Sequence, residues 1–122
     1  MVIGETKVLI CDDSILSRKK MKDFLVAAGC KEVFEAADGE TAVETYKANK
    51  PDVVFMDIVM PKKDGIGAVK DIIAFDEKAK IVMASSVGTQ ALLKDALKAG
   101  AMDFLQKPIS NDSLLDVINK LA

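Results

Sequence analysis

The sequence contains no histidine among its 122 residues. Histidine is the commonest general base in enzymes and the commonest transition-metal ligand in proteins. Its absence excludes acid–base catalysis by imidazole and metal sites built on imidazole. Any chemistry that this chain performs must therefore use carboxylates, hydroxyls and lysines.

Long apolar runs are also absent, since none approaches the ~20 residues that a membrane-spanning helix needs. The first residues, MVIGETK, lack the basic start and the apolar stretch of a secretory leader. We therefore expect a cytoplasmic protein with no membrane partner. The two cysteines, Cys11 and Cys30, have neither metal-ligand spacing nor a secreted disulfide framework around them, so we expect both to be reduced and structural.

Neither sign of charge is in excess, because 17 basic residues stand against 19 acidic ones. The basic residues are dispersed apart from short clusters such as 18–20, so nucleic acid is not an expected partner. Half of the residues are apolar, which is enough for one core at this length. We expect residues 1–122 to form a single domain with no output domain attached, and to be monomeric.

Short apolar runs rich in β-branched residues recur at five places. They are residues 8–11, 33–34, 53–56, 81–84 and 104–105. Three of these runs are continuous rather than alternating, which is typical of strands covered on both faces. Segments with helical period lie between the runs, and Gly29 and Gly100 stand where helices should end. The Asp-Gly pairs at 38–39 and 64–65 have the composition of turns.

Five strands that alternate with five helices predict an α/β fold. The expected architecture is a single doubly wound (βα)5 domain of the flavodoxin type, with a five-stranded parallel sheet and helices on both faces. In a parallel sheet all the carboxyl ends of the strands lie on one edge. Open α/β folds bind their ligands at that edge, so the residues that follow the strands are the candidates for function.

Polar side chains follow four of the five runs. Asp12 and Asp13 follow the first run, Asp57 the third, Ser85 the fourth and Lys107 the fifth. Three carboxylates placed close together repel one another and raise each other's pKa, so a cation is expected among them. An all-oxygen cluster suits a hard dication, and Mg²⁺ fits best because it accepts one or two carboxylates and keeps positions for water and phosphate oxygens.

A carboxylate beside Mg²⁺ can attack phosphorus and form an aspartyl-phosphate. Asp57 is the best candidate for this nucleophile, because it stands singly at the end of a central strand. Lys107 can neutralise phosphoryl oxygens as a point charge, and Ser85 can donate a hydrogen bond to them.

Ordinary structural roles are the alternatives to this interpretation. N-capping of a helix could explain one of the two acids Asp12 and Asp13, and Asp57 could be a solvated turn acid. Ser85 or Ser86 could cap the helix that follows them. Lys107 and Pro108 could form an extended surface dipeptide. Independent causes of this kind do not explain why all these groups fall on one edge of the sheet, so we favour the metal and phosphoryl interpretation.

The segments CDDS, MDIVMP with DG beyond it, MASS and FLQKP occur in this order at these intervals. With this set the sequence resembles the receiver domain of bacterial response regulators over residues 8–121, and within that family it is most similar to the stand-alone chemotaxis members. The resemblance implies a sheet in the order 2-1-3-4-5.

The resemblance also implies a role for each residue of the site. Asp57 accepts a phosphoryl group from a phosphohistidine on a partner histidine kinase or histidine phosphotransferase. Mg²⁺ is bound directly by Asp13, Asp57 and the backbone carbonyl of Val59, and through water by Asp12. Lys107 holds the phosphate and is followed by a cis peptide bond.

A switch between two states is implied as well. The hydroxyl of Ser85 moves toward the phosphate, and the aromatic ring of Phe104 turns inward, although a lone phenylalanine at such a position is more often part of the core. The face made by the fourth helix, fifth strand and fifth helix then binds a downstream protein. Two departures from the best-known chemotaxis pattern stand out: Phe104 replaces the usual tyrosine, and Val59 and Val87 are apolar where polar side chains often place the hydrolytic water.

Three functions compete. The first is a phosphorylation switch in chemotaxis or, alternatively, a phosphorelay intermediate that passes phosphate to a histidine phosphotransferase; self-phosphorylation and self-dephosphorylation are then its whole chemistry. The second is a Mg²⁺-dependent phosphohydrolase, which would require an acidic residue at the position of Val59. The third is a flavodoxin-like carrier, whose phosphate loop the charges of Asp12 and Asp13 would oppose. We favour the first, in chemotaxis.

Overall fold

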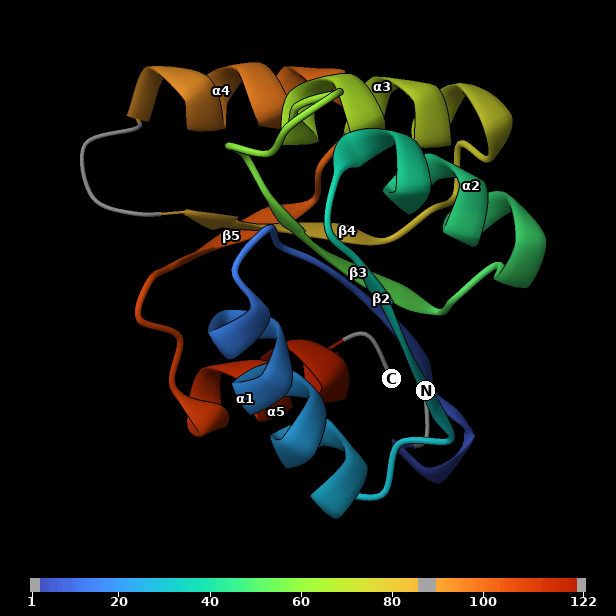
Figure 1. Cartoon of the computed structure of the whole chain (residues 1–122), viewed down its shortest axis with the longest axis vertical. Coiled ribbons are helices and arrows are strands. Elements are labelled where there is room, and N and C mark those ends of the chain that lie inside the picture. Colours follow the sequence, from blue (N-terminus) through green and yellow to red (C-terminus); the bar gives the residue numbers. More distant parts are fainter. Residues whose placement is uncertain (1–2, 86–89, 121–122) are drawn as a thin grey trace.

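Five parallel strands form a single sheet in the order β2-β1-β3-β4-β5 (Figure 1). The structure is a computed structural model and describes residues 3–85 and 90–120. The strands are β1 Lys7–Cys11, β2 Glu32–Ala36, β3 Val53–Asp57, β4 Ile81–Ser85 and β5 Asp103–Gln106. The predicted α/β class, the parallel sheet and the strand order are confirmed.

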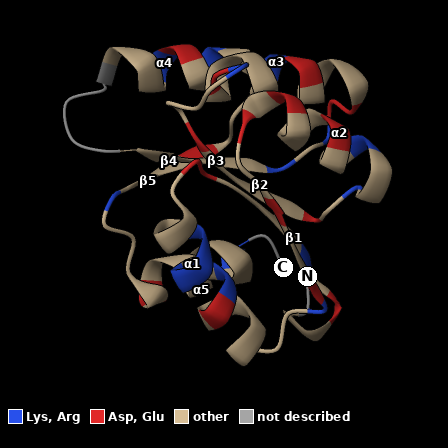
Figure 2. Cartoon of the chain, viewed as in Figure 1, with Lys and Arg blue, Asp and Glu red and all other residues tan. Residues whose placement is uncertain are grey.

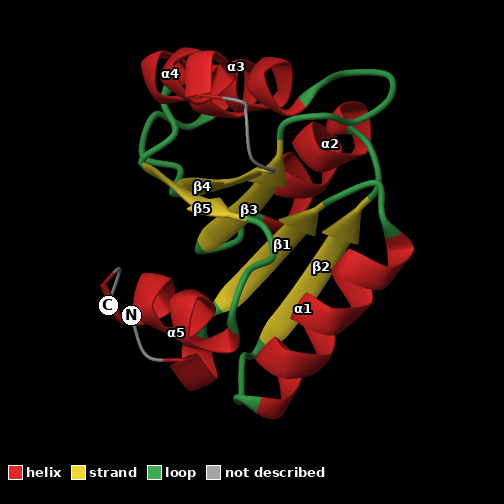
Figure 3. Ribbon diagram, turned by 90° about the vertical axis from the view of Figure 1, so that its left-hand side faces the viewer, coloured by secondary structure: helices red, strands yellow, loops and turns green. Residues whose placement is uncertain are grey.

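Helices cover both faces of this sheet, as the side view in Figure 3 shows. They are α1 Ile15–Ala27, α2 Gly39–Asn49, α3 Gly65–Phe75, α4 Gln90–Ala99 and α5 Asn111–Lys120, with a short 3-10 turn, η1, at Ile3–Glu5. Helices α1 and α5 lie on one face, and α2, α3 and α4 lie on the other. None of the helices in the described segments combines the length and the apolar composition that crossing a bilayer requires.

Each face of the sheet has its own hydrophobic core. In β1, Leu9 packs into the core under α2, α3 and α4, whereas Val8 and Ile10 pack into the core under α1 and α5. All three side chains are at most 1% exposed. Successive side chains of a strand point to opposite faces, and here both faces are covered, which explains why the apolar runs are continuous.

The residues at the starts and ends of the helices agree with the sequence predictions only in part. Gly29 and Gly100 end α1 and α4 with positive φ angles of 102° and 126°, as predicted. The prediction of turns at the two Asp-Gly pairs was wrong, because Asp38 and Asp64 are the N-caps of α2 and α3. Each carboxylate accepts a hydrogen bond from the amide three residues on, at 2.8 and 2.7 Å. The same short-range bonding of aspartate serves turns and helix starts, so composition alone does not separate them.

Both cysteines are free thiols, as predicted. Burial, together with the charge of Asp12, raises the pKa of the Cys11 thiol, and burial raises the pKa of Cys30. Thiols that stay protonated are weak nucleophiles, so neither cysteine offers reactive chemistry at neutral pH.

Acidic and basic residues are interspersed along the helices of both layers (Figure 2).

Candidate functional site

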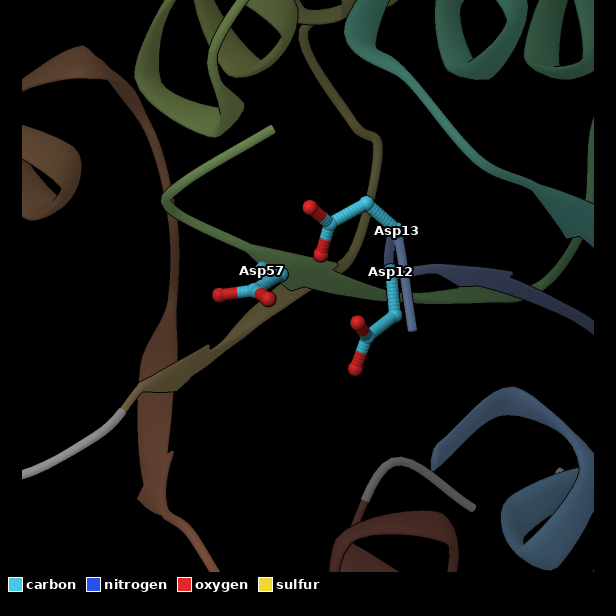
Figure 4. A group of neighbouring side chains, drawn as sticks. All are labelled: Asp12, Asp13 and Asp57. Atoms are coloured by element: carbon cyan, nitrogen blue, oxygen red, sulfur yellow. The ribbon is translucent and has the colours of Figure 1, made fainter. Parts of the chain in front are cut away.

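Three carboxylates meet at the carboxyl edge of the sheet (Figure 4). β1 and β3 are neighbours with Cys11 opposite Met56, so the residues that follow them, Asp12 and Asp57, emerge side by side. Oxygen atoms of Asp12, Asp13 and Asp57 all lie within 4.8 Å of one another. The structure therefore brings together the three acids that the strand pattern placed on this edge.

Lys107 supplies a cation to two of these acids. Its Nζ atom lies 2.8 Å from Oδ2 of Asp12 and 2.9 Å from Oδ2 of Asp57. Burial lowers the pKa of Lys107, but its hydrogen bonds and charge interactions with both carboxylates outweigh burial, so the pKa is raised overall. The ammonium group therefore stays charged at neutral pH. Its exposed fraction is 23%, so Lys107 is not the extended surface residue of the alternative interpretation.

Asp57 is poorly solvated for an ionised carboxylate. Desolvation by burial raises its pKa, the hydrogen bond and charge of Lys107 lower it, and the charge of Asp12 raises it further, with a net increase. The side chain is only 13% exposed, which contradicts the alternative of a solvated turn acid. A site that holds a carboxylate in this condition favours additional positive charge.

Helix capping does not account for the paired acids after β1. The N-cap of α1 is Ser14, whose Oγ atom accepts the amide of Ser17 at 3.3 Å. Asp12 is 3% exposed and accepts the amide of Ser14 at 2.8 Å, one residue before the helix begins. Within residues 3–85 and 90–120, no hydrogen bond or ion pair engages the carboxylate of Asp13, which is exposed. The capping alternative for Asp12 and Asp13 is therefore wrong.

The chain turns sharply after Asp57. The amide of Gly65 donates to the carbonyl of Ile58 at 2.7 Å. A Cβ atom on Gly65 would lie 1.9 Å from the backbone oxygen of Asp57, so no other residue fits. This close approach explains the glycine beyond the MDIVMP segment and fixes where the loop with Val59 leaves the strand.

The donor set fits a hard divalent cation. Every polar group that the cluster offers to a metal is a carboxylate oxygen, and oxygen donors suit Mg²⁺ and Ca²⁺ rather than softer metals. The net charge of the three acids and Lys107 is −2, so a dication is attracted to the site. An acidic cluster that can bind a metal is thus present.

Comparison with known proteins identifies the family. Residues 8–119 match the model described as the response regulator receiver domain. The chain belongs to the response regulator receiver domain family. Receiver domains are signalling proteins rather than conventional enzymes, in agreement with the function favoured from the sequence.

This receiver is similar to the chemotaxis protein CheY of Bacillus subtilis (strain 168), with 47% identity over 114 residues that cover 93% of this chain and 95% of that protein. It is 44% identical to CheY of Thermotoga maritima over 116 residues, 95% of this chain and 97% of that protein. Among solved structures it is similar to a chain of the CheX-CheY-BeF3-Mg+2 complex from Borrelia burgdorferi, with a TM-score of 0.88 and 37% identity. The match covers 95% of this chain and 88% of that chain.

The remaining residues expected to act in the receiver lie on β4 and β5 or directly after β5. Ser85 is 3% exposed, and its backbone carbonyl accepts the amide of Lys107 at 2.6 Å. The Lys107–Pro108 peptide bond is cis, as the resemblance implied. Phe104 is 44% exposed on the edge strand, so the alternative of a core residue is wrong. Ser86 and Val87 lie outside the described residues.

Arg18 is a residue of the receiver site that the sequence did not reveal. Its Nη1 atom donates to the backbone oxygen of Asp12 at 2.6 Å, and its Nε atom lies 3.4 Å from Oε1 of Glu35 on β2. The guanidinium therefore ties the end of β1 to the neighbouring strand. In the sequence, Arg18 was part of a short basic cluster on a helix, and nothing in that pattern indicated its partners.

Proposed function

We propose that residues 1–122 act as one receiver unit that accepts a phosphoryl group on Asp57 from a phosphohistidine of a partner histidine kinase. A carboxylate oxygen of Asp57 attacks phosphorus, the bond between phosphorus and the imidazole nitrogen breaks, and the leaving imidazole nitrogen takes up a proton from solvent water. The single observation that carries this proposal is the convergence of the carboxylates of Asp12, Asp13 and Asp57, two of which are bonded to the ammonium group of Lys107.

Asp13, Asp57 and the backbone carbonyl of Val59 are proposed to bind Mg²⁺, with Asp12 acting through water. When bound, Mg²⁺ neutralises charge on the phosphoryl oxygens. The carboxylates position the attacking oxygen, and the cost of crowding them is offset by the dication.

Lys107 is proposed to exchange its carboxylate partner for a phosphoryl oxygen. Its Nζ atom is 2.9 Å from an oxygen of the attacking carboxylate, so a phosphoryl group on Asp57 comes within reach of the same ammonium group. An ammonium group donates to phosphate oxygens as strongly as to carboxylates. Lys107 therefore stabilises the product without moving far.

The signal is proposed to leave through protein contacts of the face made by α4, β5 and α5. Ser85 donates to the phosphate, and Phe104, now half-exposed on β5, turns inward in the active state. This is a shift between two pre-existing conformations, driven by the different contacts that each makes with the phosphate. Val59 is 68% exposed, and its apolar side chain offers no polar group to a hydrolytic water, which supports slow self-dephosphorylation.

A role in chemotaxis is supported by the relatives named CheY that cover nearly all of this chain. The phosphorelay alternative predicts rapid phosphate transfer onward to a histidine phosphotransferase. We further propose a cytoplasmic location, which the free thiols of Cys11 and Cys30 support.

The proposal is tested by incubating the protein with acetyl phosphate and MgCl₂ and measuring its intact mass. The expected result is the addition of one base-labile phosphate that depends on Mg²⁺. Asp57→Asn should add none, whereas Asp116→Asn, which removes an exposed carboxylate on α5, should add it normally. Incorporation by Asp57→Asn would show that the nucleophile is misassigned.

A further inference from the structure

The first turn of α2 packs directly against the loop that joins β3 to α3. A Cβ atom on Gly39 would lie 2.0 Å from the carbonyl oxygen of Lys63 and 2.7 Å from the Cβ atom of Lys63. Both distances are well inside van der Waals contact, so only glycine fits between the two segments. Beside this contact, Nζ of Lys62 lies 3.9 Å from Oδ2 of Asp38. The start of α2 therefore touches two successive residues of the loop.

The same loop, residues 58–64, carries the chain onward from Asp57. At its far end, the amide of Gly65 is bonded back to the carbonyl of Ile58. The side chain of Lys63 forms an ion pair with Asp71 of α3. The loop is thus held by its contact with α2 in addition to its connections to β3 and α3.

We propose that Gly39 is a positioning residue of the metal site, although it touches neither a carboxylate of the cluster nor the phosphoryl group. Because Gly39 has no side chain, α2 can pack directly against Lys63. This contact holds the loop in a position where the backbone oxygen of Val59 can bind the cation beside Asp57. The inference rests on the proposed function and adds to it a residue on a different helix. It predicts that the metal affinity of the cluster depends on how closely α2 approaches the loop.

A methyl group at position 39 displaces the loop more readily than the helix. Helix α2 is fixed by its buried residues, since Ala42 and Tyr46 are at most 2% exposed. The loop is held by Ile58 and Met60, 4% and 7% exposed, but its residues 61 and 62 next to the contact are exposed, with the side chain of Lys62 63% exposed. Because the clashing atom is a backbone oxygen, rotation of a side chain does not relieve the contact. The substitution Gly39→Ala therefore shifts the segment that carries the backbone ligand.

Gly100→Ala is a matched control for this substitution. Gly100 has a φ of 126°, and a Cβ atom there would lie 2.6 Å from Cγ1 of Ile73, so this change is also strained. It precedes β5, whereas the carboxylates follow β1 and β3, so it lies at the opposite edge of the sheet. Both variants should lower the thermal midpoint, but only Gly39→Ala should disturb the metal site.

Isothermal titration with MgCl₂ tests the inference on the unaltered protein and both variants, at a temperature at which all three are folded. We expect Gly39→Ala to bind Mg²⁺ about tenfold more weakly, the low end of the effect of groups that orient metal ligands. Gly100→Ala should keep the original dissociation constant despite its lower thermal midpoint. An unchanged constant in Gly39→Ala, or equal weakening in both variants, would overturn the inference. Failure of the unaltered protein to bind Mg²⁺ would instead overturn the proposed function.

Amide hydrogen exchange on the unaltered protein provides a test that does not depend on the folding of a variant. Coupling is reciprocal, so if the α2 contact supports metal binding, Mg²⁺ must stabilise the start of α2. The amides of Thr41 and Ala42, bonded to Asp38 at 2.8 and 3.0 Å, should exchange more slowly with Mg²⁺. The amide of Lys31, bonded to the carbonyl of Thr6 at the opposite edge, should change less. Equal responses at the two edges contradict the inference.

Discussion

Replacing Asp13 by asparagine should stabilise the metal-free protein and weaken its binding of Mg²⁺. Asp13 is exposed, and its carboxylate lies within 4.8 Å of two others. Asp12 is a poorer choice for this test, because its carboxylate is paired with Lys107 and accepts the amide of Ser14. Its neutralisation would break favourable contacts as well as repulsive ones. Asp13→Asn changes the charge of the cluster with little else.

The size of the effect follows from the charges around Asp13. Asp12, Asp57 and Lys107 together carry a net charge of −1, so Asp13 is repelled by about one unit charge. At 4.8 Å, the upper limit of the separations within the cluster, this repulsion is about 0.9 kcal/mol in a water-like dielectric and about 3.5 kcal/mol at an effective dielectric constant of 20. Asp13 is exposed, so we expect the lower end, about 1 kcal/mol. For a domain of this size, that corresponds to a rise of roughly 3–5 °C in the thermal midpoint.

Denaturant unfolding in EDTA and calorimetric titration with MgCl₂ measure the two effects on the same sample. We expect the free energy of unfolding to rise without metal and the affinity for Mg²⁺ to fall at least about tenfold, because one charged ligand is lost. Asp116→Asn removes the same charge from α5 and controls for net charge. An Asp13→Asn protein that is less stable in EDTA and still binds Mg²⁺ normally would refute the idea that repulsion in this cluster is relieved by a cation.

Three further predictions concern the same edge of the sheet. Lys107→Met should lower the free energy of unfolding in EDTA by about 1–3 kcal/mol, since it leaves Asp12 and Asp57 without their cation, and an unchanged denaturation midpoint would contradict this. Burial raises the pKa of Asp57, so the folded state binds a proton more readily than the unfolded state does. The metal-free protein should therefore gain stability from this group as the pH falls from 7 through the raised pKa toward about 4. Asp57→Asn should remove that gain in denaturation series across this pH range, and an identical pH dependence in both proteins would be the contrary result. Ile15 and Leu16 are each 72% exposed at the start of α1, and we expect a partner kinase to dock on them. Replacing both by serine should therefore slow phosphoryl transfer from the kinase but not from acetyl phosphate. Equal rates of transfer from the kinase to the two proteins would argue against docking there.

Two features could be predicted from the sequence because their causes are local. Continuous apolar runs arise wherever a strand is covered on both faces, and both faces of this sheet are covered. Parallel strands then place Asp12, Asp13 and Asp57 on one edge without knowledge of any loop. The fold class and the acidic cluster follow from these two facts.

The partners of the charged residues were decided only by the tertiary structure. Lys107 meets Asp12 across 95 positions of sequence, and Arg18 meets Glu35 because β1 and β2 are neighbours. These contacts depend on strand order and on how closely side chains pack, which periodicity does not contain. They give Asp12 a cation partner and leave Asp13 exposed, although the two are adjacent in sequence.

The role of the Asp-Gly pair at 38–39 illustrates the same limit. Its composition is compatible with a turn or a helix start, and the choice was made by the packing of α2 on the sheet. That Gly39 must also be glycine follows from the carbonyl of Lys63, 24 positions away in sequence and 2.0 Å from where a Cβ atom would stand. Sequence by itself determined the strands and the residues at their ends, because backbone periodicity is local. Tertiary structure decided solvation, ion pairing and steric fit, because these depend on atoms brought together from distant segments.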